Sequence, residues 1–420
     1  GKAVQILQIN DDHSFSLNES QLEAILLDDR VKDKPVVVVS VAGTYRQGKS
    51  FLLAFFLRFF QNQCQSKWLD DSRIPLGGFE WKPGSKRHTT GILLWSVPFL
   101  VTTPGGEEVA VLLMDTQGSF DCKSTVKACT TIFALSIMIS SVQVYNIFRN
   151  IQEYHLQHLQ FSSEFGTLAQ EETGIAPFQR LVFLVRDWPF NEEADFGAVG
   201  GHSVLQGCLK IVDEQRDELQ RLRRQIWSSF SQIDCFLMPR PGDKVETDCF
   251  FQGSLQDIDS NFKQKVQELV HLLLAPENLV TKKINGQKIT CEELMSYFRA
   301  YARVFQGGTL PQPKAVLQVS HKGFSEEYWS SSLAFQATVE ASNMAAKKKA
   351  MIFYLDSMNR IPRGDLHKLL ESHAVLLEEA TKLFKRTPKF GDESVSQSYL
   401  EALTTASFLL FLQNHAVNIM

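Results

Sequence analysis

The chain has 420 residues, of which 44% are hydrophobic, and a formal net charge of −4. Its length suits a large domain followed by a smaller one, and its apolar content is enough for a substantial core. The near balance of 43 basic and 47 acidic side chains gives no reason to expect a nucleic-acid partner. The seven cysteines are scattered and form no C-x-x-C pair, which predicts a reduced, cytosolic environment.

Neither a signal peptide nor a membrane span can be identified in the sequence. It begins with Gly1 rather than Met, so we expect a fragment of a longer protein. No apolar run reaches the length of about 18 residues that a membrane helix needs, and the nearest, Ala402–Leu412, is shorter. We therefore expect this fragment to be soluble.

Over residues 1–310, short apolar runs alternate with longer amphipathic segments. Four runs are rich in apolar and β-branched residues and are typical of strands buried on both faces: Val36–Ala42, Val109–Met114, Leu181–Val185 and Cys235–Met238. Helix-like stretches such as Leu205–Phe230 lie between them. The alternation predicts the α/β fold class, with a mostly parallel sheet and helices on both faces.

The pattern changes at Gly307–Lys314, where two glycines and two prolines interrupt helix formation, so we predict a linker over residues 307–315. Beyond it, apolar residues follow helical spacing in three segments: Ala341–Leu355, Leu366–Leu383 and Tyr399–Leu410. Three amphipathic helices need one another to bury such stripes. Residues 316–420 are therefore predicted to form an all-α three-helix bundle.

The segment Gly43–Ser50 (GTYRQGKS) matches the phosphate-binding pattern G-x-x-x-x-G-K-S, the P-loop. Gly43 and Gly48 let the backbone curl so that its N–H groups face phosphate oxygens. Lys49 would bring a positive charge to the β- and γ-phosphates, and Ser50 would offer its hydroxyl to Mg²⁺. A strand-like run precedes the segment and an apolar helix-like run follows it. With that context, a chance glycine-rich turn is the much poorer explanation.

The second predicted strand is followed by Asp115–Gly118 (DTQG), which has the D-x-x-G form of nucleotide switches. Asp115 would reach Mg²⁺ through water, and the N–H of Gly118 would turn toward the γ-phosphate. The pattern is common when taken alone. Its place at the end of a buried strand after a P-loop gives it weight.

Two further patterns are open to a second interpretation. The segment His88–Gly91 (HTTG) could supply a threonine hydroxyl to Mg²⁺, or be a plain loop before a strand at Ile92–Val97. Arg186 and Asp187 end the third predicted strand, where a carboxylate can accept the N1–H and N2 amine of guanine. A surface ion pair would look the same in sequence, and the usual N/T-K-x-D signature is absent.

The order of these patterns decides between the interpretations. The P-loop, the threonine segment, the D-x-x-G and the Arg-Asp pair come in this order, and we expect all four at strand ends that share one edge of the sheet. This arrangement predicts a Mg²⁺-dependent site for GTP and GDP. Elsewhere, His155 and His158 could bind a metal only with a third ligand that is not evident, so we interpret them as part of a polar helix face.

Several longer segments resemble the atlastin family, with guanylate-binding proteins as relatives: GTYRQGKSFLL, HTTGILLW, VLLMDTQGSFD, FLVRDW and CFLMPRPG. The resemblance runs from Val4 to about Gln318 and resumes from about Ala337. It implies that residues 1–306 are a GTPase domain of a dynamin-like protein on the cytosolic face of the endoplasmic reticulum. It also implies homodimerisation on GTP, membrane tethering and fusion, and a membrane segment beyond Met420.

The resemblance assigns roles to individual residues. Arg46 matches an arginine finger inside the P-loop and would act in catalysis with Lys49 and Thr89. Thr89 matches the Mg²⁺-binding threonine, alongside Ser50 and Asp115. The remaining matches are nucleotide contacts: Gly43, Gln47, Gly48, Phe51, Gln117, Gly118, Arg186, Asp187, Val245 and Asp248, the last two from the loop over the base.

Four features depart from the family pattern. Gln47 replaces a usual lysine, His88 a usual glutamate, and Asp248 a usual asparagine. Residues 319–336 look inserted before the first bundle helix. Two alternatives stand beside the fusion protein. One is a GTPase that acts like a guanylate-binding protein. The other is a GTP-dependent tether that hydrolyses slowly, which the departures at Gln47, Asp248 and residues 319–336 favour.

Overall fold

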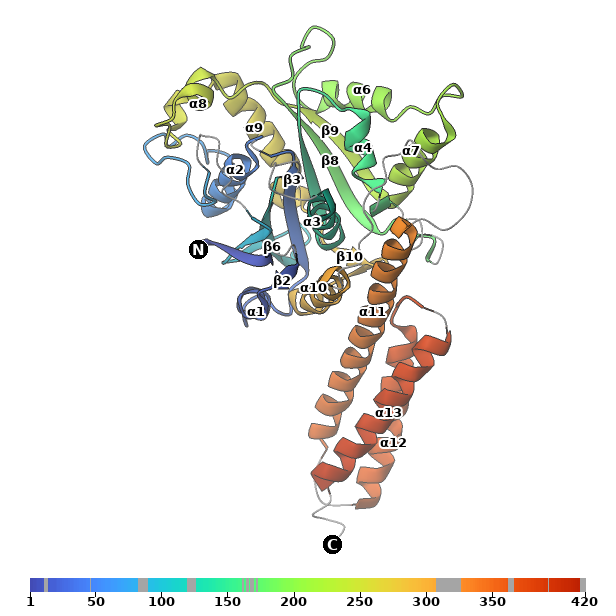
Figure 1. The fold of residues 1–420 in the computed structure, drawn as a ribbon. Helices are drawn as coiled ribbons and strands as arrows, with labels where there is room; N and C mark the ends of the chain where they lie inside the picture. The colour runs from blue at the N-terminus through green and yellow to red at the C-terminus, as the bar shows by residue number, and fades with distance from the viewer. Residues whose placement is uncertain are drawn as a thin grey trace.

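The structure is a computed structural model of the chain, shown in Figure 1. It describes residues 1–10, 14–45, 47–81, 90–118, 126–160, 162–163, 166, 170, 173–306, 326–361, 366–391 and 393–415.

The centre of the fold is a nine-stranded sheet in the order β2-β1-β4-β6-β3-β7-β8-β9, with β5 paired to β6. Five strands are mutually parallel: β3 (Val36–Gly43), β6 (Glu108–Thr116), β7 (Val142–Phe148), β8 (Phe178–Arg186) and β9 (Phe230–Leu237). The others pair antiparallel: β1 (Ala3–Ile9), β2 (Phe15–Leu17), β4 (Ile92–Trp95) and β5 (Phe99–Thr102). The predicted class, a mostly parallel sheet in an α/β fold, is confirmed.

Every residue of β3 and β8 is buried, because apolar cores cover both faces of the sheet. One core holds α2 (Lys49–Gln61) and α9 (Ser260–Leu274). The other holds α1 (Glu19–Leu26), α3 (Val126–Ile139), α6 (Ala198–Cys208), α7 (Asp217–Ser229) and α10 (Cys291–Gln306). Shorter elements are α4 (Glu153–Gln157), α8 (Asp243–Thr247), η1 (Leu255–Asp257), η2 (Pro276–Asn278), β10 (Lys283–Ile284) and β11 (Gln287–Lys288).

The four strands predicted to be buried on both faces lie within β3, β6, β8 and β9, although Met238 lies just beyond the end of β9. The strand expected at Ile92–Val97 is β4, which ends at Trp95. The helix predicted over Leu205–Phe230 is wrong: α6 ends at Cys208, α7 begins at Asp217, and Phe230 already belongs to β9. Apolar residues such as Ile211 continue the amphipathic stripe across the break and so conceal it. Strand β7 was not predicted, because the apolar α3 runs almost directly into it.

The last three helices are α11 (Glu326–Asn359), α12 (Leu366–Arg386) and α13 (Glu393–His415). They pack against one another around a separate apolar cluster that includes Tyr354, Phe384 and Phe411. Residues 326–336, part of the segment that looked inserted, form the beginning of α11. Among the described helices, none combines the length and apolar character needed to cross a bilayer.

Figure 1 shows α11 running beside α10 at the edge of the sheet domain, while α12 and α13 extend away from it. Thr338 on α11 lies 3.2 Å from the hydroxyl of Tyr301 on α10, and Lys348 pairs with Glu292 at 2.6 Å. Val339 belongs to the same apolar core as residues of α10. The first bundle helix is therefore packed against the domain that carries the sheet.

Candidate nucleotide site

The P-loop connects the carboxyl end of β3 to α2, and its two glycines meet real steric demands. Gly43 has φ +140°, and a Cβ there would lie 2.1 Å from the carbonyl oxygen of Asn146. Gly48 has φ +70° and caps the start of α2, in the left-handed conformation that glycine adopts at little cost. Of the predicted site residues in this loop, Arg46 lies outside the described residues.

Lys49 is the buried cation of the loop. The residue is only 6% exposed, and Nζ donates a hydrogen bond to the Thr44 carbonyl at 3.0 Å. Burial lowers the pKa of Lys49 to about 8, and the nearby Asp115 carboxylate opposes that shift. A Cβ on Gly118 would lie 2.9 Å from Nζ, so the D-x-x-G turn borders the ammonium group directly. An anion would relieve the cost of burying this charge.

Ser50 and Asp115 meet beside Lys49. The Ser50 hydroxyl donates to Oδ2 of Asp115 at 2.6 Å, and Asp115 is 1% exposed at the end of β6. A hydroxyl and a carboxylate are the hard oxygen ligands that Mg²⁺ prefers, so this pair fits a magnesium site. Thr89 and His88 lie outside the described residues.

The D-x-x-G segment is joined to the end of the threonine segment by two hydrogen bonds. The N–H of Gly91 donates to Oε1 of Gln117 at 3.0 Å, and the N–H of Gln117 donates to the Gly91 carbonyl at 2.8 Å. The Thr116 hydroxyl donates to the Val41 carbonyl on β3. The two switch-like segments are therefore held together at the edge of the sheet.

Arg186 and Asp187 do not form a surface ion pair. Arg186 is 5% exposed, and its guanidinium lies 5.3 Å from the centre of the Phe262 ring and 3.5 Å from the Gln47 carbonyl. Asp187 has φ +55°, and its Oδ1 is buried with no hydrogen-bond partner among the described residues. Burial raises the pKa of Asp187, and Arg186 opposes the shift. A buried, unsatisfied acceptor is suited to a ligand that brings N–H donors.

The loop that was predicted to cover the base forms α8. Val245 packs against the apolar core on that side of the sheet, and Asp248 accepts a hydrogen bond from the N–H of Phe250 at 2.8 Å. Glu246 on α8 pairs with Arg240, and both charges influence the pKa of Asp187. The loop therefore borders the carboxylate predicted to read guanine.

Phe51 lies in an aromatic cluster, with ring centres 5.2 Å from Phe55 and 5.1 Å from Trp81. Phe51 is 5% exposed and its ring is packed among these aromatic rings, so a nucleotide contact would be made by its backbone. As the third residue of α2, Phe51 has an N–H in the first turn, where no intrahelical acceptor exists.

Sequence reasoning missed Asn146, the last residue of β7 that pairs with β3, opposite Gly43 of the P-loop. Its Nδ2 donates to the Gln47 carbonyl at 2.8 Å, and its Oδ1 is buried with no partner among the described residues. The available signal was a polar residue at the end of the apolar run VQVYN. This polar residue becomes a candidate for the site only once β7 is recognised as a strand.

The interpretation of His155 and His158 as a polar helix face is wrong. His155 is 2% exposed, and the Tyr145 hydroxyl lies 3.0 Å from Nδ1 of His158. Burial lowers the pKa of each histidine to about 4, so both are neutral at pH 7. No cluster of three potential metal ligands from His, Cys, Asp and Glu occurs in the described part of the chain.

Comparison with known proteins places this site in a family. Residues 12–283 match the family described as guanylate-binding protein, N-terminal domain. The chain is 48% identical to Atlastin-1 of Bos taurus over 415 residues, covering 98% of this chain and 71% of that protein. It is 47% identical to Atlastin-2 of Xenopus laevis, covering 96% and 70%, and 45% identical to Atlastin-2 of Homo sapiens, covering 98% and 69%. The chain therefore belongs to the atlastin family of dynamin-like GTPases, and its catalytic domain is of the guanylate-binding-protein type.

Proposed function

We propose that this GTPase homodimerises when it binds GTP and uses hydrolysis to GDP and phosphate to tether and fuse membranes of the endoplasmic reticulum. The nucleotide part of the proposal rests on one observation above all: Lys49, Ser50 and Asp115 converge at the carboxyl edge of the sheet. The membrane part rests on the similarity to atlastins over 98% of the chain. We further propose residues 1–306 as the GTPase domain, 307–315 as the linker and 316–420 as the helical bundle.

Mg²⁺ would be held by Ser50 and Thr89 directly and by Asp115 through water. When bound, it would neutralise charge on the β- and γ-phosphates. Lys49 would bind the same phosphates, and the backbone of Gly43–Gly48 would enclose them through its N–H groups. Gly118 would donate its N–H to the γ-phosphate.

The other end of the site would read the base. Asp187 would accept hydrogen bonds from the N1–H and the N2 amine of guanine. These bonds would satisfy its buried Oδ1, which has no partner among the described residues. Arg186 would hold that carboxylate and the P-loop backbone in place, since it lies near both. Val245 on α8 and Asp248 just after it would cover the base. Gln47, Phe51 and Gln117 would add contacts to the nucleotide, and Arg46 would supply charge to the transferring phosphoryl group.

A slowly hydrolysing tether is a second candidate, favoured by Gln47. The neutral side chain removes one positive charge expected near the phosphates. Charge at that place lowers the barrier to phosphoryl transfer, so its loss would slow turnover more than nucleotide binding.

Turnover and assembly, measured together, test the proposal. The chain is assayed for multiple-turnover hydrolysis of GTP, and its mass is followed by light scattering with GDP, with a GTP analogue and with a transition-state mimic. Hydrolysis together with a doubling of mass supports the fusion enzyme. A doubling of mass without hydrolysis supports the tether, and equal affinities for ADP and GDP contradict the guanine site.

A further inference from the structure

The side chain of Gln5, on β1, is hydrogen-bonded to the segment that carries the switch threonines. Its Nε2 lies 2.9 Å from the carbonyl oxygen of Thr90 and 2.8 Å from the Thr90 hydroxyl. One amide nitrogen has two hydrogens, so it can donate to both acceptors at once. The two residues are 85 positions apart in sequence, so only the pairing of β1 with β4 brings them together.

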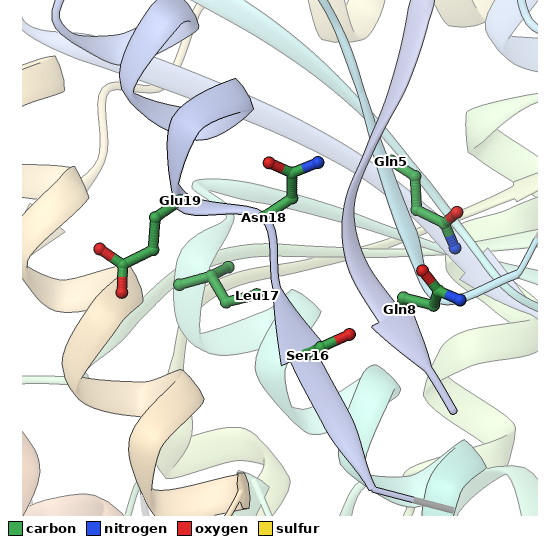
Figure 2. A pocket seen from close by; sticks show the side chains of 6 residues that line it. All are labelled: Gln5, Gln8, Ser16, Leu17, Asn18 and Glu19. Atoms are coloured by element: carbon green, nitrogen blue, oxygen red, sulfur yellow. The ribbon is translucent and has the colours of Figure 1, made fainter. Parts of the chain in front are cut away.

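An irregularity in β1 places Gln5 for this contact. The register between β1 and β4 shifts between Gln5 and Leu7, where one extra residue is accommodated. Such bulges re-aim side chains and occur beside active sites. Residues three apart on a regular strand point to opposite faces, yet Gln5 and Gln8 line the same shallow hollow of about 350 Å³. Figure 2 shows both glutamines on β1, across from Ser16 and Asn18.

Gly91, the next residue of the threonine segment, also lies against β1. Gly91 has φ +66°, and a Cβ there would lie 1.9 Å from the carbonyl oxygen of Leu7. On its other side, Gly91 exchanges two hydrogen bonds with Gln117 of the D-x-x-G segment. The end of the switch segment is thus fixed between β1 and the segment that would sense the γ-phosphate.

We propose that Gln5 is a positioning residue for GTP hydrolysis, because its amide anchors Thr90 and thereby sets the place of the adjacent Thr89. Consecutive Cα atoms are about 3.8 Å apart, so an anchor on Thr90 limits where the Thr89 hydroxyl can reach. The two adjacent threonines then have different roles. Thr90 is hydrogen-bonded to Gln5 on β1, and Thr89 would bind Mg²⁺. The inference rests on the proposed function, from which the role of Thr89 comes.

Gln5→Glu tests the anchor with a side chain of the same shape. The carboxylate has no hydrogens to donate at neutral pH, and it faces the Thr90 carbonyl oxygen with a negative charge. Gln8→Glu is the matched control, because Gln8 is exposed, lines the same hollow and adds the same charge without a described hydrogen bond to Thr90. Thr90→Val, which removes only the hydroxyl acceptor, is the second probe.

Three readouts are compared in the intact chain: GDP affinity, turnover as a function of GTP and Mg²⁺, and amide hydrogen exchange of residues 88–95. We expect Gln5→Glu to lower kcat about tenfold, to raise the Mg²⁺ requirement and to leave GDP affinity unchanged. A tenfold effect corresponds to about 1.4 kcal/mol, the scale of one or two hydrogen bonds. Exchange at Thr90 and Gly91 should rise in Gln5→Glu, rise less in Thr90→Val, and stay unchanged in Gln8→Glu.

The outcomes separate the anchor from the function on which it rests. Normal exchange and normal Mg²⁺-dependent turnover in folded Gln5→Glu would overturn the proposal, as would an equal loss in Gln8→Glu. If the wild-type chain fails to hydrolyse GTP, the proposed function fails and Gln5 loses its role in hydrolysis. Even if the wild-type chain does not hydrolyse GTP, amide hydrogen exchange would still show whether Gln5 holds Thr90 in place.

Discussion

The Ser50 hydroxyl donates a 2.6 Å hydrogen bond to Oδ2 of Asp115, although 65 residues separate the two in sequence. Both side chains carry oxygen ligands suited to Mg²⁺. Removing the Ser50 hydroxyl should therefore weaken Mg²⁺ binding more than binding of the guanine base. We predict that Ser50→Ala raises the Mg²⁺ concentration for half-maximal turnover by about tenfold or more, or about 1.4 kcal/mol. Titration of turnover with Mg²⁺ at saturating GTP measures this. Ser40→Ala is the control, because Ser40 is buried on β3 with no side-chain partner among the described residues; an equal effect there would argue against a metal role for Ser50.

Asp187 should select guanine and make its binding sensitive to acid. A guanine ring would satisfy the buried carboxylate, whereas adenine would leave it unpaired at a cost of about 1–3 kcal/mol. We predict that GDP binds about tenfold tighter than ADP or better, and that Asp187→Asn weakens GDP binding. Calorimetry with both nucleotides measures the difference, and the exposed Asp213→Asn serves as the control.

The raised pKa of Asp187 fixes the sign of the pH effect. Guanine would bind the ionised carboxylate, so binding below the raised pKa must release a proton. GDP affinity should therefore weaken as the pH falls through this pKa, and Asp187→Asn should lose that dependence. An affinity that rises toward acidic pH in the wild-type chain would contradict the assignment.

Lys49 should control phosphate binding, and its titration should be visible near neutral pH. Its pKa of about 8 lies well below the ordinary 10.5 because the ammonium is buried. A phosphate beside it would favour the protonated form, so GDP affinity should fall as the pH rises above about 8. Lys49→Ala should abolish binding, whereas Lys283→Ala, an exposed lysine on β10, should not. Calorimetry between pH 7 and pH 10 checks both statements, and GDP binding by Lys49→Ala would remove Lys49 from this role.

The sequence predicted what local patterns encode and missed what depends on pairing over long separations. The strands β3, β6 and β8 were predicted because their residues are buried on both faces and read as continuous apolar runs. Strand β7 was hidden because α3 before it is equally apolar, and Asn146 on that strand was missed with it.

Contacts made across the sheet leave no local signal. The contact of Gln5 with Thr90 depends on β1 lying against β4, and the contact of Asn146 with the Gln47 carbonyl depends on β7 lying beside β3. The lysine, serine and aspartate of the candidate site could be predicted because their spacing follows a motif. The residues that position that site could not, since their partners are set by topology.

Arg46 carries the prediction that separates catalysis from binding. It lies outside the described residues, so its role stays a proposal from the family resemblance. A finger acting in cis would matter only when charge builds on the transferring phosphoryl group. GDP affinity should then be almost unchanged in Arg46→Ala, while turnover falls by a factor of about 10³–10⁵, which corresponds to about 4–7 kcal/mol of barrier.

Arg216→Ala, at an exposed arginine before α7, is the control and should change neither GDP affinity nor turnover. Both constants are measured on the same preparation, so that a loss of folded protein cannot pass for a loss of catalysis. Normal turnover in Arg46→Ala would refute the finger and leave Lys49 and Mg²⁺ as the charges that stabilise the transition state.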